Sequence, residues 1–538
     1  MPSAYPTSDR VAENSHDQNF TADVLVIGGS LSGAWAAYTA RAAGADVILA
    51  EKGYVGTAGV VAAASCGGDH IVPGDAEQRH KVLHQRQKAA CDIDDLPFFE
   101  RVLNECYAVG KKLQALGYAP GDGPRSLTSF PGAYSMNFLR KLLVKSGVRI
   151  LDNSPALELL TNGGTVSGAA GVNRQTGASW SVRAGATILA TGGNAFRSGA
   201  MGTNGSTGDG YLMAAEVGAS FTGLEYSGHY GIAPINSSCT KGFWYGSATF
   251  FNARGEELNG NGWASVPTVA KAIIETGAAY ARITKPSPLG SGARNTAFHV
   301  YCRRLGIDPE KEKFQVELLL EGTVRATGGI PVDDTAATEI PGLFAVGDVA
   351  DRTKLTGAAM SGAGPAIAWC LASGEWGGHG AAAYATRRRR EDLRGILEAN
   401  GRVGLRPSRA DVSVAHREIV QGVQNEILPL DKNCFRREGA LRSSLQNLDD
   451  LWASSRAGLT GGDARELFKS REAAALVATG RWINHAALTR TETRGLHRRS
   501  DYTTADSAQL HQTRIGGLDQ LWTRSEPLSK NAPVAAVA

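Results

Sequence analysis

Cysteine pairs are missing from this sequence. Its seven cysteines are scattered over 538 residues, and no two of them are spaced as CxxC. A disulfide framework, a zinc site and an iron–sulfur cluster held by this chain alone are therefore not predicted. We interpret the cysteines as thiols in a reducing cytoplasm, and we expect no metal site.

Long apolar runs and an excess of one charge are missing too. No apolar run reaches the ~18 residues that span a bilayer, and residues 1–20 are polar, without the apolar core of a signal peptide. The 56 basic and 52 acidic residues leave a net charge of +4, which gives no reason to expect a nucleic-acid partner or an anionic membrane. The basic run over 387–390 is typical of a solvated helix face. These features predict a cytoplasmic protein without membrane insertion.

Glycine, in contrast, is abundant, with 66 residues, and this favours tight turns or a close approach of the backbone to a ligand. The length predicts two or three packed units, because one domain typically holds ~100–200 residues. An apolar run over 23–27 meets a glycine turn over 28–33, and an alanine-rich stretch over 34–43 leads to a second apolar run over 46–50. This order predicts a right-handed βαβ unit in a parallel sheet.

The glycine turn has most of the dinucleotide-binding fingerprint. Gly28 permits the tight turn, and Gly33 lets the helix pack closely on the strand, so that the helix N-terminus faces the phosphates. Ser30 stands where the fingerprint has its second glycine. Glu51 ends the second strand, 23 residues beyond Gly28, where a carboxylate accepts hydrogen bonds from the adenosine ribose. Together with the neighbouring Lys52, these residues predict a dinucleotide site.

Two later strand-like runs, over 186–190 and 342–346, also end in glycine turns. They lie more than 150 residues apart, so we expect the first domain to be interrupted and then resumed. An aromatic-rich, irregular segment lies between them, and helical periodicity without glycine turns begins near residue 408. The expected organisation is a polar tail (1–20), a nucleotide domain in two parts (21–220 and 328–385), an inserted domain (221–327), a linker (386–407) and a helical C-terminal domain (408–538).

Five ordered motifs carry a resemblance to a known family. They are Leu-Ala-Thr-Gly-Gly at 189–193, Thr-Gly-Asp-Gly-Tyr at 207–211, Gly-Gly-Ile-Pro at 328–331, Ile-Pro-Gly-Leu-Phe-Ala-Val-Gly-Asp at 340–348 and Glu-Thr-Arg-Gly-Leu-His at 492–497. In this order they resemble the fumarate reductase and succinate dehydrogenase flavoprotein family, which includes L-aspartate oxidase and the adenylylsulfate reductase flavoprotein subunit. The resemblance implies an α/β fold: a Rossmann-like FAD-binding domain interrupted by an α+β capping domain and followed by a C-terminal helical domain.

The resemblance also implies cofactor contacts. Asp348 corresponds to the acid that binds the FAD ribitol, and Gly347 lets the backbone pass close to it. Thr191, Gly192 and Asp209 correspond to the other side of the FAD cradle, and Thr57, Ala58 and Gly59 fall where the family's chain runs along the flavin ring. Members that bind FAD covalently use a histidine in that stretch. None occurs between residues 51 and 68, so we expect noncovalent FAD.

The substrate motifs depart from the family pattern. Dicarboxylate-specific members clamp a carboxylate with an arginine, whose planar fork pairs two oxygens at once, and Met360 stands at that place. The histidine expected shortly before Gly328 is replaced by Val324, although Arg325 is adjacent and could take a related part. Succinate, fumarate and aspartate are therefore not the expected substrates.

The inserted domain contains a replacement set of reactive groups. Lys241 occupies the place of an arginine that moves a proton in the family, and a lysine can act as an acid if burial tunes its pKa. His229 and Tyr230 lie in a stretch that resembles the family's histidine-containing motif. A solvated lysine, a buried structural histidine and a packing aromatic are equally compatible with these three positions.

Two functions are consistent with these observations. The first is an FAD-dependent dehydrogenase or reductase that acts on a small molecule, with hydride exchange at the flavin and proton transfer by a residue of the cap. The second is the flavoprotein subunit of an electron-transfer complex, in which a separate ferredoxin-like iron–sulfur protein exchanges the electrons. The complete set of cofactor residues argues against a noncatalytic scaffold.

Overall fold

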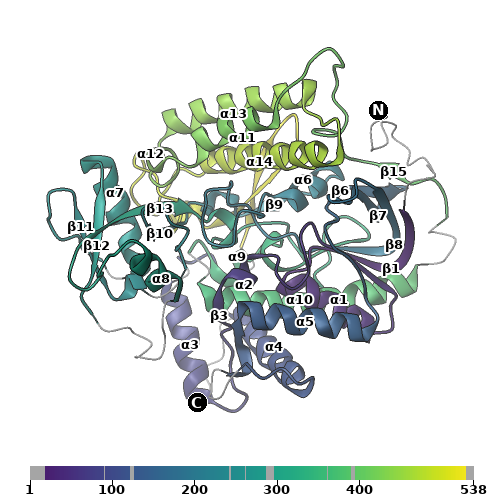
Figure 1. The fold of residues 1–538 in the computed structure, drawn as a ribbon, viewed down its shortest axis with the longest axis horizontal. Helices are drawn as coiled ribbons and strands as arrows, with labels where there is room; N and C mark the ends of the chain where they lie inside the picture. Colours follow the sequence, from purple (N-terminus) through teal and green to yellow (C-terminus); the bar gives the residue numbers. More distant parts are fainter. Residues whose placement is uncertain are drawn as a thin grey trace.

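The computed structural model describes residues 18–89, 91–120, 126–241, 244–260, 262–285, 296–359, 362–388 and 394–528. Figure 1 shows the elements after residue 229 that form the cap at the left of the view, the long C-terminal helices along the top and the first domain at the lower right.

The first domain is built on a sheet of eight strands. Its order is β15-β6-β7-β8-β1-β2-β5, and β14 also pairs with β8. The strands are β1 (Gln18–Ile27), β2 (Val47–Ala50), β5 (Arg149–Leu151), β6 (Ala156–Asn162), β7 (Thr165–Val172), β8 (Ser179–Leu189), β14 (Leu343–Ala345) and β15 (Glu398–Ala399). The predicted βαβ unit is confirmed, because β1 pairs with β2 in parallel around the crossover helix α1 (Leu31–Ala42).

Strand β8 organises this sheet because it takes part in two kinds of pairing. Along its length it is parallel to β1, its first part pairs antiparallel with β7, and its last residues pair in parallel with β14. The carboxyl ends of β1, β8 and β14 therefore meet at one edge, followed by Gly28, Thr191 and Gly347, so the three predicted glycine turns come together.

Helices cover the parallel part of the sheet. Helix α1 packs against α10, and α10 packs against β8 and α4. The helices of this domain are α2 (Val60–Ala63), α3 (Ala76–Ala89), α4 (Leu96–Ala115), α5 (Gly132–Ser146), α6 (Asp209–Glu216), α9 (Thr353–Thr356) and α10 (Ala363–Arg387), and a two-stranded sheet joins β3 (Ser65–Gly67) and β4 (Ser129–Pro131). The predicted interruption is confirmed, since α10 returns to the first domain after the cap.

The cap is a four-stranded antiparallel sheet with two helices. Its strand order is β10-β13-β12-β11. The elements are β10 (Tyr230–Pro234), β11 (Ala248–Asn252), α7 (Val266–Thr276), β12 (Ala279–Ile283), α8 (Thr296–Arg304) and β13 (Phe314–Leu320). Trp244 stacks on Phe298 with ring centroids 4.8 Å apart and also contacts Phe314. The aromatic residues of the inserted segment thus form the core of the cap.

The C-terminal part consists of α11 (His416–Ile427), α12 (Leu430–Asn433), α13 (Glu438–Gly458) and α14 (Ala464–Thr489). Helix α14 is buried along most of its length and packs against α6 of the first domain. Two features are absent from the sequence prediction: residues 398–399 of the expected linker form strand β15, and a hairpin of β16 (His511–Gly516) and β17 (Trp522–Pro527) follows the helices and pairs with β9 (Phe221–Thr222).

Candidate active site

The glycine turn after β1 is a close contact between three backbone segments. Gly28 has a φ of +104°, and a Cβ there would lie 2.4 Å from the carbonyl oxygen of Ala190. A Cβ on Gly33 would lie 1.9 Å from the oxygen of Gly28. Any side chain at either position would separate β1, β8 and α1. Glycine is therefore required for steric reasons at both positions of the motif, Gly28 and Gly33.

Glu51 connects the turn to the end of β2. Its carboxylate accepts hydrogen bonds from the backbone N–H of Gly29 and of Gly53, both at 2.7 Å. The residue is 6% exposed, yet its carboxylate lies on the pocket wall. Two backbone donors orient the carboxylate toward the position where the fold receives a ribose.

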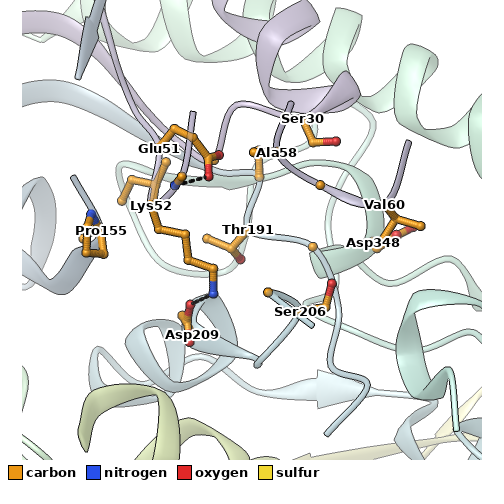
Figure 2. Close-up of a pocket in the computed structure, with 18 of the residues that line it drawn as sticks. Ser30, Glu51, Lys52, Ala58, Val60, Pro155, Thr191, Ser206, Asp209 and Asp348 are labelled. Atoms are coloured by element: carbon orange, nitrogen blue, oxygen red, sulfur yellow. Dashed lines mark hydrogen bonds and ion pairs between the residues drawn. The ribbon is translucent and has the colours of Figure 1, made fainter. Parts of the chain in front are cut away.

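A pocket of about 400 Å³ runs from Glu51 to Asp348. Figure 2 shows these two residues at opposite sides of the pocket. The predicted cofactor residues that line it are Gly28, Ser30, Glu51, Lys52, Ala58, Gly59, Thr191, Gly192, Asp209 and Asp348. This agreement extends over segments more than 150 residues apart in the chain.

Three predicted cofactor residues do not line the pocket. Gly33 and Gly347 act in packing, since a Cβ on Gly347 would lie 2.3 Å from the hydroxyl oxygen of Ser32. Thr57 is exposed, and a turn in which its N–H donates to the carbonyl of Tyr54 directs it away from the pocket. Its neighbours in the same segment, Ala58 and Gly59, line the pocket instead.

Asp348 at the far end is held by a buried arginine. The Arg352 guanidinium pairs with its carboxylate and donates to the carbonyls of Thr323, Val324 and Ala326. Arg352 is 1% exposed, whereas the Asp348 side chain keeps 17% exposure. Arg352 thus fixes the segment before the Gly-Gly-Ile motif and also holds Asp348, which still faces the pocket.

The pocket fits FAD by its shape and its unsatisfied groups. The glycine turn and the N-terminus of α1 line the pocket through Gly28, Ser30 and Leu31, and a helix N-terminus after such a turn is a ready site for a pyrophosphate. The buried hydroxyl of Thr191, on the pocket wall, has no hydrogen-bond partner among the described residues. A ligand with several polar groups between Glu51 and Asp348 would satisfy it.

The cap brings a buried carboxylate to the same region. Strands β10 and β13 pair antiparallel with Tyr230 opposite Leu320. His229 and Glu321, the residues just outside this last strand pair, also lie opposite each other, and the Glu321 N–H donates to the His229 carbonyl at 2.9 Å. Glu321 is 0% exposed, and a buried carboxylate needs compensating charge or hydrogen bonds.

Lys241 supplies the nearest compensating charge. Its Nζ lies 2.9 Å from Glu321 Oε1, which also accepts a hydrogen bond from the Thr240 hydroxyl at 2.7 Å. The Lys241 side chain is 8% exposed. The other oxygen, Oε2, lies 3.5 Å from Arg325 Nε and 3.8 Å from His229 Nε2. Three of the four predicted catalytic residues therefore surround one carboxylate.

Burial and charge act against each other in this cluster. Burial lowers the pKa of Lys241, although the Glu321 carboxylate opposes the change. Burial alone would raise the pKa of Glu321, but Lys241 and Arg325 outweigh it and hold that pKa at about 2. Burial lowers the pKa of His229 to about 3, so that its imidazole is neutral at pH 7. Lys241 is the member whose pKa moves toward neutrality, as a proton donor requires.

Tyr230, the fourth predicted catalytic residue, points elsewhere. Its hydroxyl donates to the carbonyl of Leu428 at 3.1 Å, between the cap and the C-terminal helices. Burial raises its pKa, so its place in the structure is that of a packing residue.

The cluster lies against the cofactor pocket. Lys241 Nζ also donates to the Met201 carbonyl at 2.6 Å, and the next residue, Gly202, lines the pocket. Thr323, two residues after Glu321, accepts from the Asn194 N–H at 2.8 Å, just beyond the wall residues Thr191 and Gly192. Arg352, which pairs with Asp348, donates to the carbonyl of Thr323. The cluster is therefore next to the Asp348 end of the pocket, although its four residues are not among those that line it.

Sequence reasoning missed several of these residues. Glu321 has no motif around it, and only the register of β10 on β13 would have indicated it. The pocket-lining residues Arg174, Phe468 and Glu472 come from a hairpin turn and from α14, which carry no sequence signal for a cofactor. Met360 lies outside the described residues.

Comparisons with known proteins agree with this geometry. The family described as "FAD binding domain" matches residues 23–365, and the family described as "Fumarate reductase flavoprotein C-term" matches residues 425–524. The chain belongs to the fumarate reductase and succinate dehydrogenase flavoprotein family. Within this flavoprotein the two matched regions follow one another in the predicted order, and together they make it an FAD-dependent oxidoreductase.

Individual relatives are distant. The flavoprotein is 27% identical to L-aspartate oxidase of Mycobacterium leprae over 95% of this chain and 99% of that protein. It is similar in structure to the Escherichia coli quinol fumarate reductase subunit FrdA, with a TM-score of 0.76 and 20% identity over 96% of this chain and 98% of the other. It is also similar in structure to adenylylsulfate reductase of Archaeoglobus fulgidus, with a TM-score of 0.72 and 16% identity over 98% of this chain and 99% of the other. The two structural likenesses confirm the fold.

Two further findings concern the described part of the flavoprotein. None of its helices combines the length and apolar character needed to cross a membrane. The same residues contain no group of three histidine, cysteine, aspartate or glutamate side chains that could hold a metal ion.

Replacement of Glu51 by alanine should weaken FAD binding at least about tenfold. The change removes a charge-assisted acceptor, and such hydrogen bonds contribute ~1.5–3 kcal/mol each, with ~1.4 kcal/mol equal to a factor of ten. Titration of cofactor-depleted protein with FAD measures the affinity. Glu398→Ala, on an exposed residue of the same sheet, is the control, and equal affinities for the two variants would contradict the role of Glu51.

Proposed function

We propose that this flavoprotein is a dehydrogenase or reductase whose cap residue Lys241 exchanges a proton with a small substrate beside noncovalently bound FAD. When bound, FAD supplies the two-electron chemistry by exchanging a hydride with the substrate at N5. The observation that carries the proposal is the buried Lys241–Glu321 pair, in which Lys241 also donates to the carbonyl of Met201, the residue before the pocket-lining Gly202.

The roles of the chain's own residues follow from their positions. Lys241 transfers the proton, because burial lowers its pKa and it lies closer to the Glu321 carboxylate, at 2.9 Å, than Arg325 does at 3.5 Å. Glu321 keeps Lys241 in place and stabilises its charged form. Arg325, whose side chain is 12% exposed, orients the substrate as a fixed cation, and neutral His229 completes the wall of the cluster.

The proposed substrate is a small molecule other than a simple dicarboxylate. Known relatives include L-aspartate oxidases, but Met360 stands in this sequence where their dicarboxylate clamp has an arginine. Val324, at the place of the family histidine, is 2% exposed and has no polar side-chain atom. A methionine and a valine cannot pair with two carboxylates.

The second candidate role of this protein is that of a flavoprotein subunit in an electron-transfer complex with a separate iron–sulfur protein. The scattered cysteines of the chain do not have the spacing of an iron–sulfur ligand set. Electrons that leave the reduced cofactor for such a cluster would therefore pass to a ferredoxin-like partner protein. Reoxidation of the reduced enzyme that is faster with oxidised ferredoxin of a suitable reduction potential than with dissolved oxygen would support this role.

Replacement of Lys241 by methionine should slow the substrate step at least ~100-fold, the lower range for loss of a general acid. The probe is dithionite-reduced enzyme mixed with a panel of α,β-unsaturated ketones, amides and monocarboxylates, with flavin absorbance as the signal. The variant is then compared with wild type on the compound that reoxidises the wild-type enzyme fastest.

Lys311→Met is the matched control, because the Lys311 side chain is 84% exposed on the cap. FAD content and the absorption spectrum should stay unchanged in both variants. A Lys241→Met enzyme that reacts at the wild-type rate would move the proton transfer to another residue.

Fumarate should not reoxidise the reduced enzyme faster than buffer does, and L-aspartate should not reduce the oxidised enzyme. The physical reason is the missing carboxylate clamp. Stopped-flow absorbance of the flavin measures both reactions. Rapid bleaching by L-aspartate would assign the protein to the aspartate oxidases instead.

Acid precipitation should leave a colourless pellet and free FAD in the supernatant. The expected reason is that no histidine is present between residues 51 and 68 to form the covalent link. Absorbance of the two fractions is the measurement, and a yellow pellet would mean that another side chain holds the cofactor covalently.

A further inference from the structure

A network of four charged side chains forms one wall of the cofactor pocket. Lys52 Nζ lies 2.6 Å from Asp209 Oδ2 and 3.0 Å from Glu472 Oε1. Arg197 pairs with the other oxygen of Glu472. All four residues line the pocket, and two cations face two anions.

The network joins parts of the chain that are far apart. Lys52 follows β2, Asp209 begins α6, and Glu472 lies on α14 of the C-terminal domain, 420 residues from Lys52. Glu472 is the deepest of these groups, with a side chain 5% exposed against 22% for Lys52. Loss of one partner would leave buried charges uncompensated, which is strongly destabilising locally.

The network is at the adenosine end of the pocket. Lys52 is the neighbour of the ribose-binding Glu51, and Figure 2 shows its side chain reaching Asp209 on the side away from Asp348. Arg174 donates to the Lys52 carbonyl at 2.8 Å. The guanidinium of Arg174 and the ammonium of Lys52 lie 5.3 Å and 5.9 Å from the ring centre of Phe468, one turn before Glu472 on α14.

We propose that α14 closes the adenosine half of the FAD site and that Glu472 is the positioning residue of this closure. Glu472 holds Lys52 and Arg197 at the pocket wall, and the Phe468 ring lies against Lys52 and Arg174. Cofactor release then requires the ion pairs between α14 and the first domain to open. The C-terminal domain thereby becomes part of the cofactor site, independently of the chemistry at Lys241.

Replacement of Glu472 by glutamine tests this closure. The side chain keeps its size but loses the charge that holds two cations, so FAD should leave the holoenzyme at least tenfold faster. Release is followed by the rise of flavin fluorescence after dilution. Glu466→Gln on the same helix, where the side chain is 42% exposed, is the control and should release FAD at the wild-type rate.

Release of FMN is a control that distinguishes an effect on the adenosine half of FAD from a general loosening of the domain. Enzyme reconstituted with FMN, which has no adenosine, should release it at the same rate in wild type and Glu472→Gln. Equal acceleration for FAD and FMN would make Glu472 a structural residue only. FAD release within twofold of wild type, or slower release, would overturn the proposal, the latter because Glu472 would then repel the phosphates.

Discussion

The ion pair between the buried carboxylate of Glu321 and Lys241 is the interaction on which the arrangement of the cap depends. Removing a carboxylate from water costs several kcal/mol unless charges and hydrogen bonds replace the solvent. Here the neighbouring residues Thr240 and Lys241 meet that need from one segment, and Arg325 does so from the turn that follows Glu321. One charge therefore fixes the end of the β10–β13 pair and places a lysine beside the cofactor pocket.

The cofactor pocket depends on a second constraint, the close approach of β1, α1 and β8. The Gly28 and Gly33 contacts leave no space for side chains, and they hold the ends of β1 and β8 close to the start of α1. Glu51 and Asp348 then lie at the two ends of one pocket. The cap places Lys241 next to the segment that contains the pocket-lining Gly202, and α14 contributes Glu472 and Phe468 to the pocket wall. Each of the three units supplies a part that the other two cannot replace.

The sequence predicted those features that depend on short spacings. Gly28 and Glu51 each follow a strand directly, so local patterns indicated them, whereas Asp348 and the domain order were expected from ordered motifs that resemble a known family. Glu321 was missed because its role depends on strand register across the cap. The hydroxyl of Tyr230 donates to the carbonyl of Leu428, a contact with a distant part of the chain that its position next to His229 in the sequence does not indicate. Glu472 and Phe468 reach the pocket only through the packing of α14, which no local pattern encodes.

A double-mutant cycle on the free energy of unfolding tests the central pairing most directly. Lys241→Met, Glu321→Gln and the double variant are unfolded in denaturant as holoenzymes. The account predicts that each single change costs about 3–5 kcal/mol, as for a broken buried pair, and that the double variant loses at least about 1 kcal/mol less than the sum. Additive losses, within about 0.5 kcal/mol, would contradict the claim that Glu321 holds Lys241 beside the cofactor.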